Sequence, residues 1–429
     1  MSGDAIESNR VKLRLDRLVA GGEAMGRLDD GRVAFVRGGL AGEEVDARVL
    51  NDRKDFVRAH VDSVDDVLEA SVERVVPTCP HRRAGCGGCG WMHLSTAAQF
   101  DAKVDIVKES LRRIGRLDDG VVDAVVRAGG SVEPFGYRTT LRLTGIAASD
   151  GGGVGFREER SDEVVAIDHC QVAHENISRL LRDLEVAPGV ELTLRTSVAT
   201  GGVTARWTKP EDRRRRGERR RKIAADAGGR GAVSGLPSDV HIGDRAFLTE
   251  RIAGANLMVS APSFFQSGAQ AAELLVDAVE RTAPELGRAK HALDAYGGVG
   301  LFAATVMRPA RHVTLVESSR SSTLDAAVNL ETRSASIVRT DVAKWVLPDG
   351  SPPIDVIVAD PARPGLAKPG VGALVATSAP VLILVSCDPG SMARDAFLLA
   401  EAGYRLESVE VLDLFPQTHH VETVARFAR

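Results

Sequence analysis

The chain has 429 residues, of which 44% are apolar and 27% are charged, and its formal net charge is -4. A chain of this length and composition is an ordinary globular protein with room for two or three domains. No apolar run reaches the roughly 18 residues of a membrane span, and the first ten residues lack the charged-then-apolar order of a signal peptide, so we expect a cytoplasmic protein.

The first predicted unit is a small antiparallel β-barrel over residues 8–65. Short runs such as RVAFVRG and EEVDARVL alternate apolar and polar residues, and GGEAMG and DDG interrupt them as turns. This alternation is typical of small barrels. The basic and small residues of the barrel would suit contact with the phosphate backbone of RNA.

Residues 66–250 predict a mainly β central domain with a cysteine cluster near its start. A helix is expected from Thr96, where Thr96 and Gln99 would form a capping box, to Ile114, with an apolar stripe for core packing. Strands with glycine-rich turns are expected over 121–205. The segment 208–235, with its arginines between Arg213 and Arg221, has almost no apolar residues, so it is either a solvated loop or an RNA contact.

Residues 255–429 alternate apolar strand patterns with helical ones. The stretches HALDAY, HVTLVE, PIDVIVAD and VLILVS are separated by helical segments, as in a doubly wound parallel sheet. The predicted fold class is therefore α/β: a C-terminal Rossmann-like domain, preceded by the barrel and the mainly β central domain.

A turn after HALDAY predicts a cofactor site. Gly298 and Gly300 fit a loose GxGxxG/A pattern between a strand and a helix, and Glu317 ends the next strand, where a carboxylate can accept hydrogen bonds from ribose hydroxyls. This geometry serves both nicotinamide dinucleotides and S-adenosylmethionine. Asp341 after the third strand and Asp360 in the acidic-Pro turn ADPARPG favour S-adenosylmethionine, because a dehydrogenase has no obvious use for that turn.

Four of the five cysteines form a three-plus-one set that predicts a metal centre. Cys79, Cys86 and Cys89 lie close together, and Cys170 follows much later. Such a set can hold zinc or a [4Fe-4S] cluster, and we favour iron-sulfur because zinc sites more often comprise two close pairs. The fifth cysteine, Cys387, follows an apolar strand and precedes a Pro-Gly turn, a position that suggests chemistry.

The chain resembles, over nearly its whole length, the TRAM-domain S-adenosylmethionine-dependent RNA uridine-5 methyltransferases that act on ribosomal RNA. The matching stretches include CPHRRAGCGGCGWMHL, GYRTTLRL, SFFQSGAQ, DAYGGVGLFA, ADPARPG, SCDPGSMARD and FPQTHHVETV. The resemblance implies that the four cysteines hold a [4Fe-4S] cluster, that Cys387 is the nucleophile and that Glu422 is the base. The residues implied to line the cofactor and target pocket are Gln266, Tyr296, Glu317, Asp341 and Asp360.

The resemblance also implies an RNA partner, with 23S ribosomal RNA favoured, no DNA and no membrane, and we expect a monomer. Five residues depart from the family's usual pattern: Gly268, Gly297, Leu301, Ala362 and Asp388. Asp388 matters most, because a carboxylate beside Cys387 opposes thiolate formation unless it is paired or points away. The alternatives are a non-catalytic RNA-binding or ribosome-assembly protein, a tRNA uridine-5 methyltransferase and, more weakly, a nicotinamide-dependent oxidoreductase.

Overall fold

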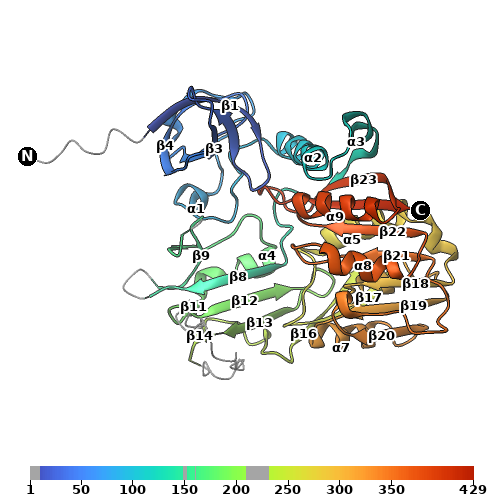
Figure 1. Cartoon of the computed structure of the whole chain (residues 1–429). Helices are drawn as coiled ribbons and strands as arrows, with labels where there is room; N and C mark the ends of the chain where they lie inside the picture. Colours follow the sequence, from blue (N-terminus) through green and yellow to red (C-terminus); the bar gives the residue numbers. More distant parts are fainter. Residues whose placement is uncertain (1–9, 148–151, 160, 209–230) are drawn as a thin grey trace, which may run out of the picture.

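The computed structural model describes residues 10–147, 152–159, 161–208 and 231–429 (Figure 1). The arginine run from Arg213 to Arg221 lies outside these residues. Figure 1 shows the barrel above the central sheet on one side, with the large C-terminal sheet and its helices on the other. Within the described part, no helix is long and apolar enough to cross a membrane.

The N-terminal strands form a closed barrel, as predicted, although one strand pair, residues 33–37 with 56–60, is parallel where an antiparallel barrel was expected. Its five main strands are β1 (Arg10–Leu18), β2 (Ala24–Arg27), β3 (Val33–Arg37), β4 (Glu44–Asp52) and β5 (Phe56–His60). The order is β1-β2-β3-β5-β4, and pairing of β1 with β4 closes the barrel. Alternate residues such as Leu13, Leu15, Val45 and Ala47 point into its core, which explains the alternating sequence. After the short helix η1 (Val64–Asp66), β6 (Val67–Glu69) pairs with β4.

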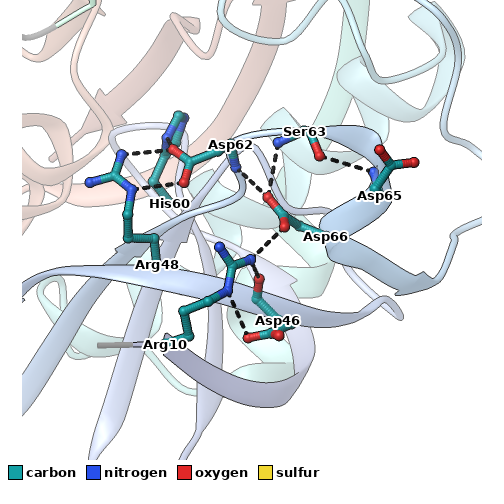
Figure 2. A network of polar contacts seen from close by, with 8 residues as sticks. All are labelled: Arg10, Asp46, Arg48, His60, Asp62, Ser63, Asp65 and Asp66. Atoms are coloured by element: carbon teal, nitrogen blue, oxygen red, sulfur yellow. Dashed lines mark hydrogen bonds and ion pairs between the residues drawn. The ribbon is translucent and has the colours of Figure 1, made fainter. Parts of the chain in front are cut away.

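Several arginines of the barrel form ion pairs with carboxylates (Figure 2). Arg48 donates two hydrogen bonds of 2.7 Å to Asp62, which lower the pKa of that carboxyl to about 2. Arg10 binds Asp46 and Asp66. Asp66 also completes a capping box with Ser63 at the start of η1. These guanidinium groups are already paired with carboxylates, so we expect phosphate contacts to use other residues of the barrel.

A short helix and two longer ones follow the barrel: α1 (Pro80–Arg83), α2 (Thr96–Arg113) and α3 (Asp119–Val125). The predicted capping box is wrong by one residue, because Ser95 is the N-cap and accepts a hydrogen bond from the N–H of Ala98. Gln99 is instead fully buried. Val107 and Leu111 of the predicted stripe are buried, whereas Ile114 is exposed. Residues 121–125 belong to α3, where strands were predicted.

The central region contains a six-stranded sheet with its own apolar core. Its order is β10 (Val164–Ala166), β9 (Val154–Arg157), β8 (Thr140–Gly145), β12 (Glu191–Thr196), β13 (Val203–Thr208) and β15 (His241–Ile242). Helix α4 (Glu175–Ser178) and η3 (Leu181–Asp183) pack beside it, and β11 (Glu185–Val186) pairs with β14 (Val233–Ser234). The hairpin of β16 (Phe247–Ile252) and β17 (Ala255–Ser260) leads to the C-terminal part.

The C-terminal part is built on one eight-stranded sheet. Its order is β20 (Ala335–Arg339), β19 (His312–Glu317), β18 (His291–Ala295), β21 (Val356–Ala359), β22 (Val381–Ser386), β24 (Glu422–Ala428), β23 (Arg405–Asp413) and β7 (Val126–Ser131). The strands from β20 to β22 are parallel, β24 is antiparallel to β22, and β7 is parallel to β23. Because β7 belongs to this sheet, the range 66–250 does not coincide with one sheet.

Helices cover both faces of this sheet, as the doubly wound prediction requires. They are α5 (Ala269–Thr282), α6 (Leu301–Ala304), α7 (Arg320–Asn329), α8 (Ala367–Ala376) and α9 (Pro389–Glu401), with short η5 (Pro284–Arg288) and η6 (Val342–Lys344). Alternate residues of β22 enter opposite cores: Ile383 packs on the α5 side, and Leu382 on the side of α8 and α9. Helix α2 packs against α9 on this second side.

Candidate active site

Cys387 lies at the end of β22, in the turn before α9. Strand β22 is fully buried up to Ser386, whereas Cys387 is half-buried and accessible. The neighbouring carboxylate of Asp388 accepts a hydrogen bond of 2.7 Å from the N–H of Ser391, at the positive end of α9. The helix therefore stabilises the charge of Asp388. This carboxylate is paired, as thiolate formation at Cys387 requires.

Two carboxyl groups approach Cys387 from the neighbouring strands. In the antiparallel pair of β22 and β24, Ser386 faces Thr423, so Cys387 and Glu422 lie one step further along the same register. Asp360 directly follows β21 on the other side of β22. The structure therefore brings Cys387, Glu422 and Asp360 together at one edge of the sheet.

Burial and mutual repulsion govern the protonation of this trio. Burial raises the pKa of Glu422 well above its usual value, and the nearby carboxylate of Asp360 raises it further. Burial also raises the pKa of Asp360. The pKa of Cys387 rises to about 11, chiefly through burial and then through Glu422 and Asp360. Two carboxyl groups in such a site share a proton and titrate as a pair.

Arg363 provides an opposing positive charge that the sequence reasoning missed. It lies three residues after Asp360, in ADPARPG, and it lowers the pKa of Cys387. One of its N–H groups donates to Nδ1 of His420 at 3.1 Å. Burial lowers the pKa of His420 to about 3, so this imidazole is neutral and can accept. The ADPARPG motif contains this arginine, but the prediction from sequence rests on its acidic residue alone.

The predicted cofactor residues meet at the same edge of the sheet. Glu317 ends β19 and accepts hydrogen bonds from the N–H of Gly298 at 3.1 Å and from Ser319 at 2.6 Å. Gly298 and Gly300 have φ angles of +55° and +88°, conformations that glycine adopts without strain. The turn that follows β18 is thus tied to the end of β19.

The remaining predicted residues border this turn. Nε2 of Gln266 lies 3.4 Å from Oδ2 of Asp360. Tyr296 follows β18 with a φ of +61°, and burial together with the charge of Asp341 raises its pKa to about 12. Asp341 caps η6 by accepting a hydrogen bond from the N–H of Ala343. The seven predicted cofactor residues therefore line one continuous edge of the sheet.

Asp294, inside β18, is a functional candidate that the sequence reasoning treated only as part of a strand. It is fully buried, and its Oδ2 accepts a hydrogen bond of 3.0 Å from the N–H of Ala303. Among the described residues, its Oδ1 has no hydrogen-bond partner. Burial and the charges of Asp360 and Glu317 raise the pKa of Asp294 to about 8. A cation beside these carboxyl groups would favour their ionised forms, so the site suits a cationic sulfonium ligand.

The four clustered cysteines line one cavity of about 50 Å³ between the segments 79–89 and 165–172. Burial raises the pKa of Cys86 and Cys170, and it raises that of Cys89 to about 12. Buried thiols become good ligands only when a cation stabilises the thiolates. Within the described chain, no three of these sulfur atoms lie within 4.8 Å of one another. A tetrahedral zinc site would bring them to about 3.8 Å.

A buried polar network connects the cysteine loop to the segment before Glu422. The N–H of Trp91 donates to the carbonyl of Gln417 at 3.0 Å. The side chain of Gln99 donates to Oε1 of Gln417 at 3.1 Å and accepts from its N–H at 2.7 Å. Gln417 has a φ of +69°, which a non-glycine residue adopts only when its surroundings hold it. Gln99 thus fixes the chain that leads to Glu422.

Comparisons with known proteins agree with this arrangement. Residues 13–61 match the TRAM domain family. An uncharacterized RNA methyltransferase of Streptomyces avermitilis is 34% identical over 424 residues, covering 94% of this chain and 95% of its own. The 23S rRNA (uracil(1939)-C(5))-methyltransferase RlmD of Pseudomonas putida is 31% identical, covering 97% and 93%.

The fold has a full-length counterpart among solved structures. The Pyrococcus abyssi tRNA (uracil-54, C5)-methyltransferase, in complex with S-adenosyl-L-homocysteine, matches with a TM-score of 0.68 and 22% identity, covering 97% of this chain and all of its own. At this identity the match shows the shared fold. Together with the relatives above, these observations show that the chain belongs to the family of TRAM-domain RNA uracil-C5 methyltransferases.

Proposed function

We propose that the protein methylates carbon 5 of a uridine in structured RNA, with S-adenosylmethionine as methyl donor and 23S ribosomal RNA as the favoured substrate. The observation that carries this proposal is the placement of Cys387 beside Glu422 and Asp360, next to the carboxylate-rich cofactor edge. The relatives named as RNA methyltransferases support the reaction class. We further propose that the protein acts as a monomer in the cytoplasm.

Cys387 acts as the nucleophile. Carbon 5 of uracil attacks a methyl group poorly, so the thiol of Cys387 first loses its proton. The Glu422–Asp360 pair accepts this proton and releases it to solvent, so that Glu422 can accept a second proton later, and the thiolate adds to carbon 6. The electrons of the 5,6 double bond move into an enolate, which makes carbon 5 nucleophilic. S-adenosylmethionine supplies the methyl group to that carbon. The target base must be lifted out of its stack to reach the edge of the sheet.

Glu422 acts as the base that completes the reaction. After methyl transfer, carbon 5 carries both the new methyl group and its original hydrogen. Glu422 removes that proton, the double bond re-forms, and the thiolate leaves carbon 6. The raised pKa of Glu422 suits this task, because a carboxylate with a high pKa is a stronger base than an exposed one. The net change replaces hydrogen by methyl and releases one proton.

The cofactor residues fit S-adenosylmethionine through their charges. Glu317 would bind the ribose hydroxyls, Asp341 the adenine edge, and Gln266, Tyr296 and Asp360 the region between cofactor and uracil. Gly298 and Gly300 allow the turn to approach the cofactor closely. The carboxyl group of Asp294, whose Oδ1 has no hydrogen-bond partner among the described residues, lies beneath the site.

The cysteine set fits a [4Fe-4S] cluster better than zinc. Cys79, Cys86, Cys89 and Cys170 line one cavity, and their three-plus-one arrangement in the sequence is less typical of zinc, whose sites more often comprise two close pairs. A bound cluster would join the segment that carries Cys79, Cys86 and Cys89 to the one that carries Cys170. Through the hydrogen bond from Trp91, it would also help to fix the position of Gln417. Anaerobically purified protein should be brown, and Cys86→Ala should lose its iron. Stoichiometric zinc without iron would support the zinc alternative.

The mechanism is tested by separating the roles of Cys387 and Glu422. Cys387→Ala should bind RNA and S-adenosylhomocysteine yet transfer no methyl group, because no adduct can form. Glu422→Gln should methylate once and remain joined to the RNA. The trapped species should migrate slowly on a denaturing gel, carry label from methyl-labelled S-adenosylmethionine and be absent from the Cys387→Ala/Glu422→Gln double variant.

The exposed residue Glu401 provides a matched control, since Glu401→Gln should turn over normally. Native turnover by Glu422→Gln would assign the base to another group, with Asp360 next, and normal methylation by Cys387→Ala would refute the covalent route. Mapping 5-methyluridine in ribosomal and transfer RNA from a deletion strain identifies the substrate.

A further inference from the structure

A second group of potential metal ligands lies at the rim of the cysteine cavity. It consists of Nε2 of His81, Nδ1 of His169 and Oδ1 of Asp168, which all lie within 4.8 Å of one another. The two nitrogen atoms are 3.2 Å apart. The carboxylate oxygen is 2.8 Å from the nitrogen of His81 and 2.7 Å from that of His169. Three ligand atoms of two types thus converge on one point.

In the chain without a metal these separations are hydrogen-bond distances, and they also match the edges of a metal coordination shell. With metal–ligand distances of about 2.0–2.1 Å, adjacent ligands lie about 2.9 Å apart in an octahedral complex and about 3.3 Å apart in a tetrahedral one. The three observed separations lie close to these values. The imidazole rings are inclined at 57° with their centroids 4.7 Å apart, so their nitrogen atoms converge without the rings stacking face to face.

The surroundings leave room for additional ligands. His81 and Asp168 also line an open hollow of about 300 Å³, together with Gly152, Leu181, Arg182 and Glu185. Water can therefore reach the outer side of the group. The nearby guanidinium of Arg82 donates to the carbonyl of Cys86 at 3.2 Å and lies 3.8 Å from Glu159, so that cation is directed elsewhere.

We propose that His81, Asp168 and His169 bind a divalent transition-metal ion, with water in the remaining positions. Two imidazoles and one carboxylate suit zinc, cobalt or nickel better than calcium or magnesium, which prefer oxygen ligands. The site lies at the rim of the cysteine cavity but uses none of the sulfur atoms, and both sets of ligands join the same two chain segments. The ion forms a second connection between them, at the solvent-facing rim, whichever metal the cysteines hold.

The test is a titration of the full-length protein, purified anaerobically with its cysteine site loaded and its iron and zinc quantified. Added Co²⁺ should bind at one further site and give only the weak visible bands of nitrogen and oxygen ligands. Asp168→Asn and His169→Gln should weaken this binding by at least about tenfold while iron content is unchanged. Asp239→Asn and His241→Gln, at exposed positions in the same sheet region, should bind as the wild type does.

The proposal is overturned if the wild type binds no further equivalent below about 100 µM, or if intense sulfur-to-metal bands show that the ion has entered the cysteine site. It is equally overturned if both variants bind as tightly as the wild type. Should Asp168→Asn lose iron, Asp168→Glu tests the same carboxylate with its charge retained and should bind more tightly than Asp168→Asn. If Asp168→Asn and Asp168→Glu both lose iron, the Co²⁺ titration of the wild type and its visible spectrum decide the proposal by the criteria above.

Discussion

Nζ of Lys103 lies 2.6 Å from Oδ1 of Asp413, and both side chains are fully buried. The same ammonium donates to the carbonyl of Phe415 at 3.2 Å, and Asp413 accepts a hydrogen bond from the N–H of Phe415 at 3.1 Å. The pair therefore holds the start of the segment that leads to Glu422. We infer that it positions this segment as well as stabilising the fold.

Lys103→Met should lower the free energy of unfolding by about 3–5 kcal/mol, because it leaves a buried carboxylate without its partner. The double variant Lys103→Met/Asp413→Leu should recover most of that loss yet remain slow in methyl transfer, since Phe415 loses its contacts. Denaturant titration and single-turnover kinetics measure the two effects. Lys108→Met, which removes a surface pair on the same helix, should change stability by less than about 1 kcal/mol. Full recovery of the methyl-transfer rate in the double variant would show that the Lys103–Asp413 pair only stabilises the fold and does not position the segment that leads to Glu422.

The thiol of Cys387 should react slowly with iodoacetamide near neutral pH. Its pKa of about 11 means that the thiolate fraction, and with it the alkylation rate, rises about tenfold per pH unit below that value. Replacing both carboxyl groups, in Asp360→Asn/Glu422→Gln, should accelerate alkylation, whereas Arg363→Gln should slow it. Peptide mass spectrometry gives the rates, and Glu401→Gln serves as control. A rate that is already independent of pH at pH 7 would show an activated thiolate in the resting enzyme.

Asp294→Asn should stabilise the protein at alkaline pH. The pKa of Asp294 is raised in the folded state to about 8, so the unfolded state binds fewer protons between about pH 4 and pH 8 and wild-type stability falls as pH rises through that window. The slope is at most about 1.4 kcal/mol per pH unit for one group. Urea denaturation at pH 5.5 and 8 should show a larger gain at pH 8. Asp349→Asn, at an exposed loop position, should differ from the wild type by the same small amount at both pH values.

RNA contact by the barrel should depend on basic residues that are not already paired. Arg53 and Lys54, in the turn between β4 and β5, are exposed and form no ion pair within the described residues. Replacing both by Gln should weaken RNA binding and reduce its logarithmic salt slope by about 1–2, because each lost phosphate contact removes the release of about one counterion. Arg48→Gln, whose guanidinium is held by Asp62, should leave the slope unchanged. Equal salt slopes for the wild type, the Arg53/Lys54 double variant and Arg48→Gln would show that RNA does not contact Arg53 and Lys54.

Much of the fold could be predicted because its sequence patterns are local. The barrel strands alternate with period two, and the buried parallel strands are continuous apolar runs bounded by turns. The edge of the sheet could also be predicted, since most candidate residues there lie at the end of a strand or within a few residues after it. The capping box was wrong for an instructive reason: Ser95 and Thr96 can both cap a helix, and only the burial of Gln99 against Gln417, 318 residues away, decides between them.

The residues that sequence reasoning missed depend on partners that are distant in the chain. Asp294 looks like an ordinary strand residue until its burial beside Asp360 and Glu317 is known. His81 and His169 are 88 residues apart, and nothing in their local sequence indicates that their nitrogen atoms meet. The pairing of β7 with β23 is equally invisible, because a lone strand pattern does not identify the sheet to which it belongs.

The position of β24 has a consequence for how the chain is assembled during synthesis. This strand is the last in sequence, yet it lies inside the sheet between β22 and β23, and β23 also pairs with β7, about 283 residues earlier. The ribosome therefore synthesises Cys387 before Glu422. One edge of β22 has no partner strand until β24 pairs with it. A chain that stops before β24 therefore lacks both the complete sheet and the proposed base, Glu422.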